Sequence, residues 1–164
     1  MRLLNVILAS ALIAPAAGAV PNDGDFFEQF QALAGEWQAE LPSFGKISNT
    51  IRLVSNGKGI EETIGTPDNN EVSVYVRDND RILMSHYCAM TSDGHTVRLE
   101  SRPNGPQANG LLFVFRDAIN LHSPSAPHMR RVLIRILDRD HLVEQWTKIE
   151  HGKDTVFELD FVRQ

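Results

Sequence analysis

The chain has 164 residues, one cysteine and a formal net charge of −5 at neutral pH. The acidic balance argues against nucleic acid as a partner, because a domain that binds nucleic acid needs a basic surface. A lone cysteine cannot form an internal disulfide, so Cys88 is expected to be a buried inert thiol, a metal ligand or a reactive group.

Residues 1–19 predict a secretory signal peptide. A short basic start precedes an apolar run over 3–14, and the small residues at 17–19 resemble a cleavage site. The apolar run is too short to span a membrane, and no later run approaches that length. We therefore expect residues 20–164 to form a single soluble domain that is exported to the periplasm or to the cell exterior.

A short amphipathic helix is predicted ahead of the first strand. Large apolar side chains recur at helical spacing from Phe26 to Leu33, and Gly35 ends the pattern. The pattern covers roughly two to three turns. We expect this helix to cover one end of the structure that the strands form.

From Gly35 onward, apolar and polar residues alternate as in strands. Such segments are predicted at 35–41 and near 46–54, 59–64, 71–77, 80–90, 95–102, 110–118, 129–137, 141–149 and 155–163. Turn sequences such as Asn56-Gly57 lie between them and favour antiparallel hairpins. About ten short strands joined by tight turns predict an all-β, antiparallel up-and-down barrel. The Pro-rich segment 120–128 is too long for a hairpin and is either a plain surface loop or a lid over an open end.

Two sets of motifs resemble known proteins. Gly35-x-Trp37 after a short helix, with Arg163 at the end of the last strand, resembles the signature of the calycin barrels, which are the lipocalins and their relatives. This resemblance implies a calycin-like fold in which Arg163 packs over Trp37 as a cation–π contact. Uncharacterised secreted bacterial barrel proteins are similar in a second set of motifs: His86-Tyr87-Cys88-Ala89, Phe115-x-Asp117-x-x-Asn120, His128-Met129, Asp140-His141 and Trp146-Thr147. That resemblance implies the same fold and no established activity.

Strand alternation predicts which side chains face the interior. The apolar set is Trp37, Ile51, Leu53, Ile60, Val72, Val74, Val76, Phe113, Phe115, Ile134 and Phe161. The polar set is Asn49, Glu62, His86, Cys88, Asp117, His128 and Glu144, together with Trp146. An unpaired buried polar group costs about 1–3 kcal/mol, so the polar set predicts either a satisfied network or a wet ligand cavity. The histidines at 95, 141 and 151 are expected in turns, exposed to solvent.

The strand at 80–90 carries the least common chemistry. His86 is interpreted either as a core histidine bonded to Glu62, Asp117 or a water, or as a donor that orients a ligand. Imidazole and thiolate suit zinc or copper, so His86, Cys88 and His128 are conceivable metal ligands. Because the usual zinc spacings are absent from the sequence, we predict no metal site. Haem held by a histidine is no better supported, and the cofactor is left unknown.

These patterns favour an exported barrel that binds a small, partly apolar molecule. The predicted ligand-binding residues are His86, Tyr87, Cys88, Asn120, His128 and Trp146. No catalytic residue is predicted, since the chain has no Gly-x-Ser-x-Gly elbow, phosphate loop or Rossmann glycine pattern.

Two alternatives stay open. A hydrolase or isomerase of the same fold would use Cys88 with a histidine from another strand, because positions two apart on a strand are ~7 Å apart. A protein-binding module would use the outer face of the sheet or an edge beside the 119–128 loop. The oligomeric state is left open.

Overall fold

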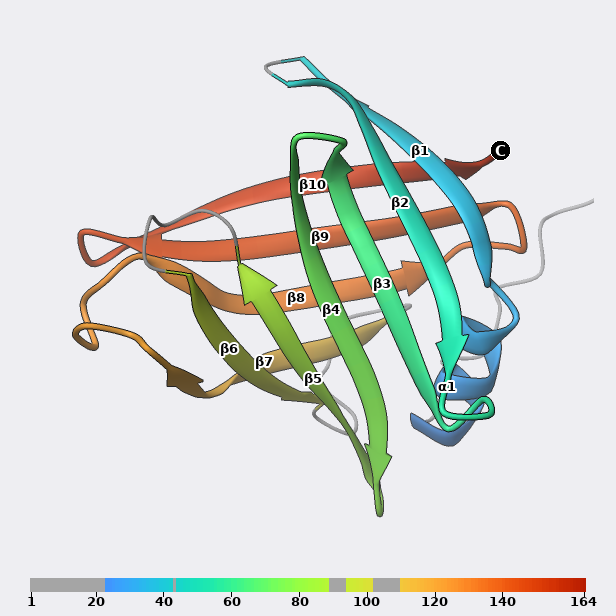
Figure 1. Ribbon diagram of the computed structural model, residues 1–164, viewed down its shortest axis with the longest axis horizontal. Helices are drawn as coiled ribbons and strands as arrows, with labels where there is room; N and C mark the ends of the chain where they lie inside the picture. Colours follow the sequence, from blue (N-terminus) through green and yellow to red (C-terminus); the bar gives the residue numbers. More distant parts are fainter. Residues whose placement is uncertain (1–22, 43, 89–93, 102–109) are drawn as a thin grey trace, which may run out of the picture.

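The computed structural model describes residues 23–42, 44–88, 94–101 and 110–164. Within these ranges the chain forms one helix and ten strands (Figure 1). They are α1 (Asp23–Gln31), β1 (Gly35–Leu41), β2 (Gly45–Val54), β3 (Gly59–Thr66), β4 (Asn69–Asp78), β5 (Arg81–Cys88), β6 (His95–Ser101), β7 (Leu111–Ile119), β8 (His128–Ile136), β9 (His141–Glu150) and β10 (Lys153–Arg163). The predicted signal peptide lies outside the described residues. None of the described residues belongs to a helix that is long and apolar enough to cross a membrane.

The strands form a closed antiparallel barrel. Each strand pairs with its neighbour in sequence, and β1 pairs with β10 to complete the ring. The closing register places Trp37 opposite Arg163 and Gln38 opposite Val162. Closure satisfies the backbone groups that an open sheet would leave at its edges. The predicted all-β up-and-down barrel is thereby confirmed, and it is consistent with a calycin-like fold.

Helix α1 lies against one end of the barrel, as Figure 1 shows. Its apolar side is fully buried, with Phe26 and Phe30 each 1% exposed. The ring of Phe30 packs edge-on against Tyr75, with 5.0 Å between ring centroids, and Tyr75 in turn packs against Phe113 at 5.6 Å. This aromatic cluster fills the helix-covered end, and we call it the closed end.

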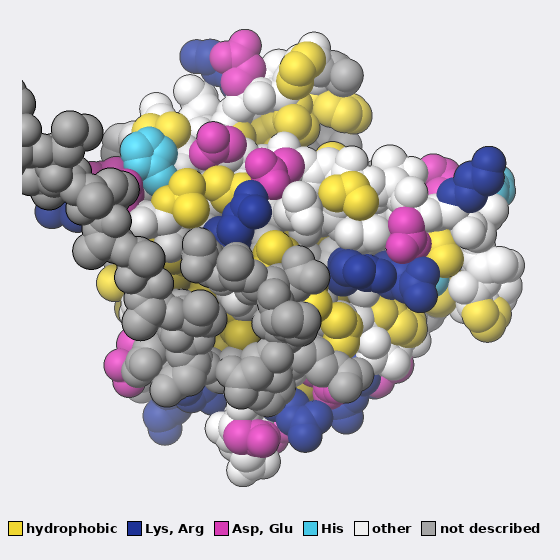
Figure 2. Space-filling model, turned by 180° about the vertical axis from the view of Figure 1, so that it is seen from behind, with side chains coloured by type: hydrophobic (Ala, Val, Ile, Leu, Met, Phe, Trp, Pro, Cys, Tyr) yellow, Lys and Arg dark blue, Asp and Glu magenta, His cyan; other side chains and the backbone are white. Residues whose placement is uncertain are grey.

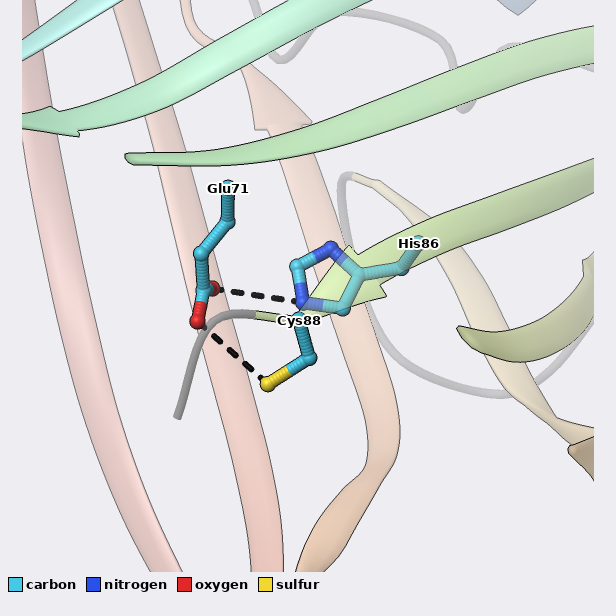
Figure 3. A group of neighbouring side chains, drawn as sticks. All are labelled: Glu71, His86 and Cys88. Carbon is cyan, nitrogen blue, oxygen red and sulfur yellow. Dashed lines mark hydrogen bonds and ion pairs between the residues drawn. The ribbon is translucent and has the colours of Figure 1, made fainter. Parts of the chain in front are cut away.

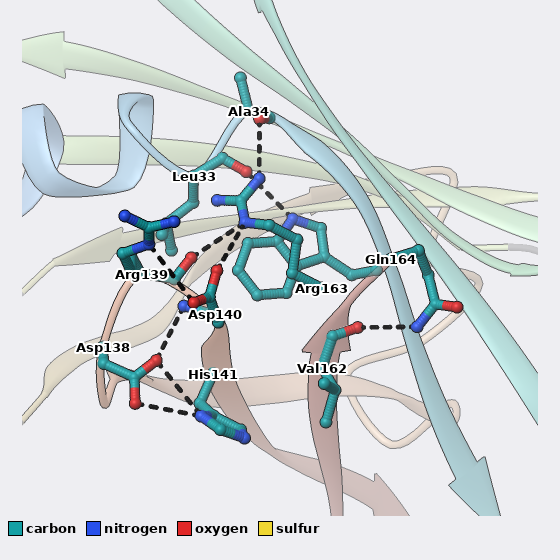
Figure 4. A network of polar contacts seen from close by, with 10 residues as sticks. Leu33, Ala34, Asp138, Arg139, Asp140, His141, Val162, Arg163 and Gln164 are labelled. Atoms are coloured by element: carbon teal, nitrogen blue, oxygen red, sulfur yellow. Dashed lines mark hydrogen bonds and ion pairs between the residues drawn. The ribbon is translucent and has the colours of Figure 1, made fainter.

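The closed end is held together by Arg163. Its guanidinium carbon lies 4.3 Å from the centroid of the Trp37 ring, which is the cation–π contact that the calycin resemblance implies. Arg163 Nε donates a hydrogen bond to the carbonyl of Arg139 at 2.9 Å, and Nη1 donates to the carbonyl of Ala34 at 3.2 Å (Figure 4). The last strand is thus joined to both the start of β1 and the β8–β9 turn.

Gly35 has no room for a side chain. A Cβ atom at this position would lie 2.6 Å from Nη1 of Arg163, and its φ of 149° is rarely adopted by other residues. The glycine of the Gly-x-Trp motif therefore gives the arginine access to the indole face.

Most of the predicted interior is confirmed. The buried side chains include Trp37, Ile51, Ile60, Phe113, Ile134, Phe161, Asn49, Glu62, His86, Cys88, Glu144 and Trp146. On the outside, basic and acidic side chains are interspersed among apolar ones on the face seen from behind (Figure 2).

Strand β4 has the opposite alternation from the one predicted. The prediction placed the valines Val72, Val74 and Val76 inside. In the structure Ser73 and Tyr75 are buried, at 2% and 0% exposure, and Val76 is 40% exposed. The register with β5 explains the difference, because Ser73 is directly opposite His86 and Tyr75 directly opposite Met84, and opposed residues share a face.

A β-bulge overturns the prediction that Asp117 faces inward. The register passes from Leu99 opposite Phe115 to Arg98 opposite Asp117, so Arg116 is an extra residue in β7. A bulge of one residue reverses the faces of everything that follows it. Asp117 consequently lies on the outer surface, where it forms an ion pair with Arg98.

Leu53 and His95 also differ from expectation. Leu53 lies at the end of β2 and is 47% exposed instead of interior. His95 is the first residue of β6 rather than part of a turn, and it is 4% exposed because it lies opposite the inward-facing Cys88. Burial lowers the pKa of His95 below its ordinary value, which favours the neutral imidazole.

Candidate functional site

A network of buried polar groups lies beside the aromatic cluster. Glu62 accepts hydrogen bonds from Asn49 Nδ2 at 2.7 Å and from the Tyr75 hydroxyl at 2.6 Å. Glu144 accepts one from Trp146 Nε1 at 2.8 Å. Burial, and next the negative charge of Glu62, raise the pKa of the Glu144 carboxyl well above its ordinary value. The raised pKa favours the protonated form of the Glu144 carboxyl, which avoids two adjacent negative charges in the interior.

A cavity of about 510 Å³ lies toward the other end of the barrel. The β1–β2 connection contributes Pro42 and Phe44 to its lining, and Thr66 comes from the end of β3. His86 and Trp146 lie at the inner end of its lining, and both are buried. The volume is within the range of small-molecule sites in proteins. We call this the open end.

Two neighbours orient His86. Its Nδ1 is 3.0 Å from the hydroxyl of Ser73 on β4, and its ring centroid is 4.8 Å from that of Trp146 on β9. Trp146 is in turn held by its hydrogen bond to Glu144. His86 is 1% exposed, so its ring has one preferred position at the wall of the cavity.

Glu71, His86 and Cys88 form a compact cluster at the open end (Figure 3). His86 Nε2 lies 3.3 Å from Oε2 of Glu71, and the thiol of Cys88 donates to Oε1 of the same carboxylate at 3.3 Å. One ligand atom from each of the three residues lies within 4.8 Å of the others. Cys88 is 5% exposed, and the Glu71 side chain is 22% exposed and lines the cavity.

The thiol of Cys88 has two polar neighbours within the cluster. It donates a hydrogen bond to the carboxylate of Glu71, and a ring nitrogen of His86 lies within 4.8 Å of its sulfur. The cluster thus brings together three groups that can each donate an electron pair to one centre.

The structure brings only part of the predicted site together. His86 and Trp146 line the cavity, and Cys88 belongs to the cluster beside it. Tyr87 lies on the outer surface and is 52% exposed. Asn120 is an exposed residue with φ of 62°, a value typical of a turn, and does not line the cavity.

His128 occupies a second depression, between β7 and β8. A bulge at Arg130 shifts the register of β8, and His128 comes opposite Ile149, with which it lines this depression. The imidazole packs against Phe115 at 4.8 Å between ring centroids, and its Nδ1 is 2.7 Å from the carbonyl of Ala126. His128 is therefore separate from the His86 cluster.

Glu71 and Ser73 were missed as site residues. Both lie on the face of β4 that strand alternation predicted to be exterior, since the prediction placed the valines of that strand inside. The polar residues at 71 and 73 in phase with Tyr75 were the available signal.

Comparison of the chain with protein-family models and with curated proteins finds no match. The fold is therefore known from the structure itself, and the similarity to secreted bacterial barrels stays a prediction.

Proposed function

We propose that this protein is an exported β-barrel that binds a small, partly apolar molecule in the cavity at its open end. The cavity itself, of about 510 Å³, is the observation that carries this proposal. Its wall includes aliphatic and aromatic side chains such as Ile47 and Phe157, and its inner end holds the buried His86 and Trp146. An apolar pocket with a few converging polar groups is the usual form of a small-molecule site.

The two kinds of lining have different tasks. Contact with the apolar wall removes ligand surface from water, which contributes about 25 cal/mol for each Å² buried. The polar contacts select and orient, because a ligand that leaves His86 or Glu71 without a partner loses affinity. The ligand class is thus a compact molecule with an apolar body and one polar end directed at His86.

A matched pair of variants tests the cavity. Thr155 lines it, and the next residue, Val156, is 57% exposed. Thr155→Trp is expected to fill the mouth, whereas Val156→Trp adds the same ring outside. The probe is the fluorophore 1-anilinonaphthalene-8-sulfonate, and only Thr155→Trp should weaken its binding, by about tenfold or more.

Native mass spectrometry of protein purified from its producing cells should also reveal a bound compound. Equal probe affinity for both variants, together with an empty protein in the mass spectrum, would contradict the proposal. Export is tested separately by sequencing the N-terminus of the same material, where retention of residues 1–19 would contradict it.

A further inference from the structure

We propose that Glu71, His86 and Cys88 bind a divalent transition metal ion, for which zinc fits the donor set best. Imidazole nitrogen, thiolate sulfur and carboxylate oxygen are the three ligand types that zinc takes in proteins. The site lies on the wall of the proposed ligand cavity, but it does not depend on an organic ligand binding there.

The spacing of the ligand atoms matches a metal centre. Two zinc ligands at bond lengths of about 2.0–2.3 Å and a tetrahedral angle are roughly 3.3–3.6 Å apart. The carboxylate oxygens of Glu71 lie 3.3 Å from His86 Nε2 and 3.3 Å from Cys88 Sγ. All three ligand atoms lie within 4.8 Å of one another. A small movement of the side chains is enough to place one ion between them.

His86 is arranged as metal-binding histidines are. Its Nδ1 is hydrogen-bonded to Ser73, and this contact directs Nε2 at the cluster. Within the described part of the chain Nε2 makes no hydrogen bond, although the ring is 1% exposed. The atom that Nε2 faces is an oxygen of Glu71. A nitrogen lone pair and a carboxylate oxygen attract each other only through a cation or a proton between them.

The charges of the cluster also match those of a divalent metal ion. Binding would release the thiol proton of Cys88 to solvent, and the thiolate with the Glu71 carboxylate would neutralise a dication. This matters because Cys88 is 5% exposed, and an unbalanced charge at such depth is costly. Glu71 and His86 also line the cavity, so a fourth ligand position would face it, as in zinc sites that keep a water or a substrate.

Cobalt(II) is the most direct probe, because Cys88 is the only cysteine in the chain. The full-length protein without an affinity tag is stripped with a chelator and titrated with cobalt. We expect a thiolate-to-cobalt charge-transfer band that saturates at about one equivalent and disappears when zinc is added. Cys88→Ser should abolish the band, and Glu71→Gln and His86→Ala should weaken binding by about 100-fold. His128→Ala removes a histidine outside the cluster, so it should leave both the charge-transfer band and the cobalt affinity unchanged.

A second measurement needs no variant. Zinc should protect Cys88 of the wild-type protein from alkylation by iodoacetamide, because a coordinated thiolate is not free to react. No charge-transfer band, unchanged zinc affinity in folded Glu71→Gln, or alkylation that zinc does not slow would each overturn the metal site. Thr155→Trp separates the two proposals, since it should block the fluorophore and leave the cobalt spectrum intact.

Discussion

Replacing Glu144 by Gln is expected to make the protein more stable at neutral and alkaline pH. Burial, followed by the charge of Glu62, raises the pKa of Glu144 well above its ordinary value, which favours the protonated carboxyl in the folded state. The unfolded chain releases that proton above about pH 4.3. The contribution of Glu144 to the free energy of unfolding is therefore fully present below that pH. It is lost as the pH rises toward the raised pKa of the folded state.

The size of the effect follows from proton linkage. One proton held by the folded state alone changes the free energy of unfolding by about 1.4 kcal/mol for each pH unit. Between pH 5 and pH 7 the wild-type protein should lose up to about 2.7 kcal/mol through this group. Gln resembles the protonated acid, and its amide oxygen can still accept the hydrogen bond from Trp146 Nε1. Glu144→Gln should therefore remove this part of the pH dependence.

Glu62→Gln is the matched control. Glu62 accepts hydrogen bonds from Asn49 and Tyr75, and an amide would turn a donor toward one of them. At pH 5 the free energy of unfolding of the control should be lower by about 1–3 kcal/mol, as expected for a buried donor without an acceptor.

The assay is urea unfolding followed by circular dichroism at pH 5, 6, 7 and 8. The same pH slope in wild-type and Glu144→Gln proteins would refute the reasoning. Stabilisation by Glu62→Gln in its place would put the proton on the other carboxyl.

Three further predictions concern the closed end. Gly35→Ala should lower the free energy of unfolding by about 1–3 kcal/mol in urea titrations, because its Cβ would lie 2.6 Å from Arg163 Nη1; a change below about 0.5 kcal/mol would contradict this. Arg163→Lys should lower the free energy of unfolding by about 1–2 kcal/mol and shift the fluorescence of Trp37, since an ammonium group cannot stack on indole as a planar guanidinium does. An unchanged spectrum and an unchanged stability would argue against the contact. Asp138→Asn should lower the pKa of His141 toward its ordinary value, because the hydrogen bond that His141 Nδ1 donates to the Asp138 carboxylate is the main cause of its raised pKa. NMR titration measures this pKa, and a value that does not change would count against the reasoning.

The order of elements could be predicted from the sequence because its causes are local. Side chains alternate along any strand, and turn residues separate the strands, so the ten-strand antiparallel meander follows without knowledge of distant contacts. The same alternation placed His86 and Cys88 inside, in phase with Ile82 and Met84. The contact of Arg163 with Trp37 was predictable from the calycin resemblance.

The composition of the candidate site was decided by the tertiary structure alone. Glu71 joins His86 and Cys88 only through the register of β4 on β5, and both faces of β4 carry residues that a core can accept. Bulges at Arg116 and Arg130 moved Asp117 to the outer surface and His128 to a separate depression. Register and bulges depend on the partner strand, so a strand considered by itself does not reveal which side chains share a site.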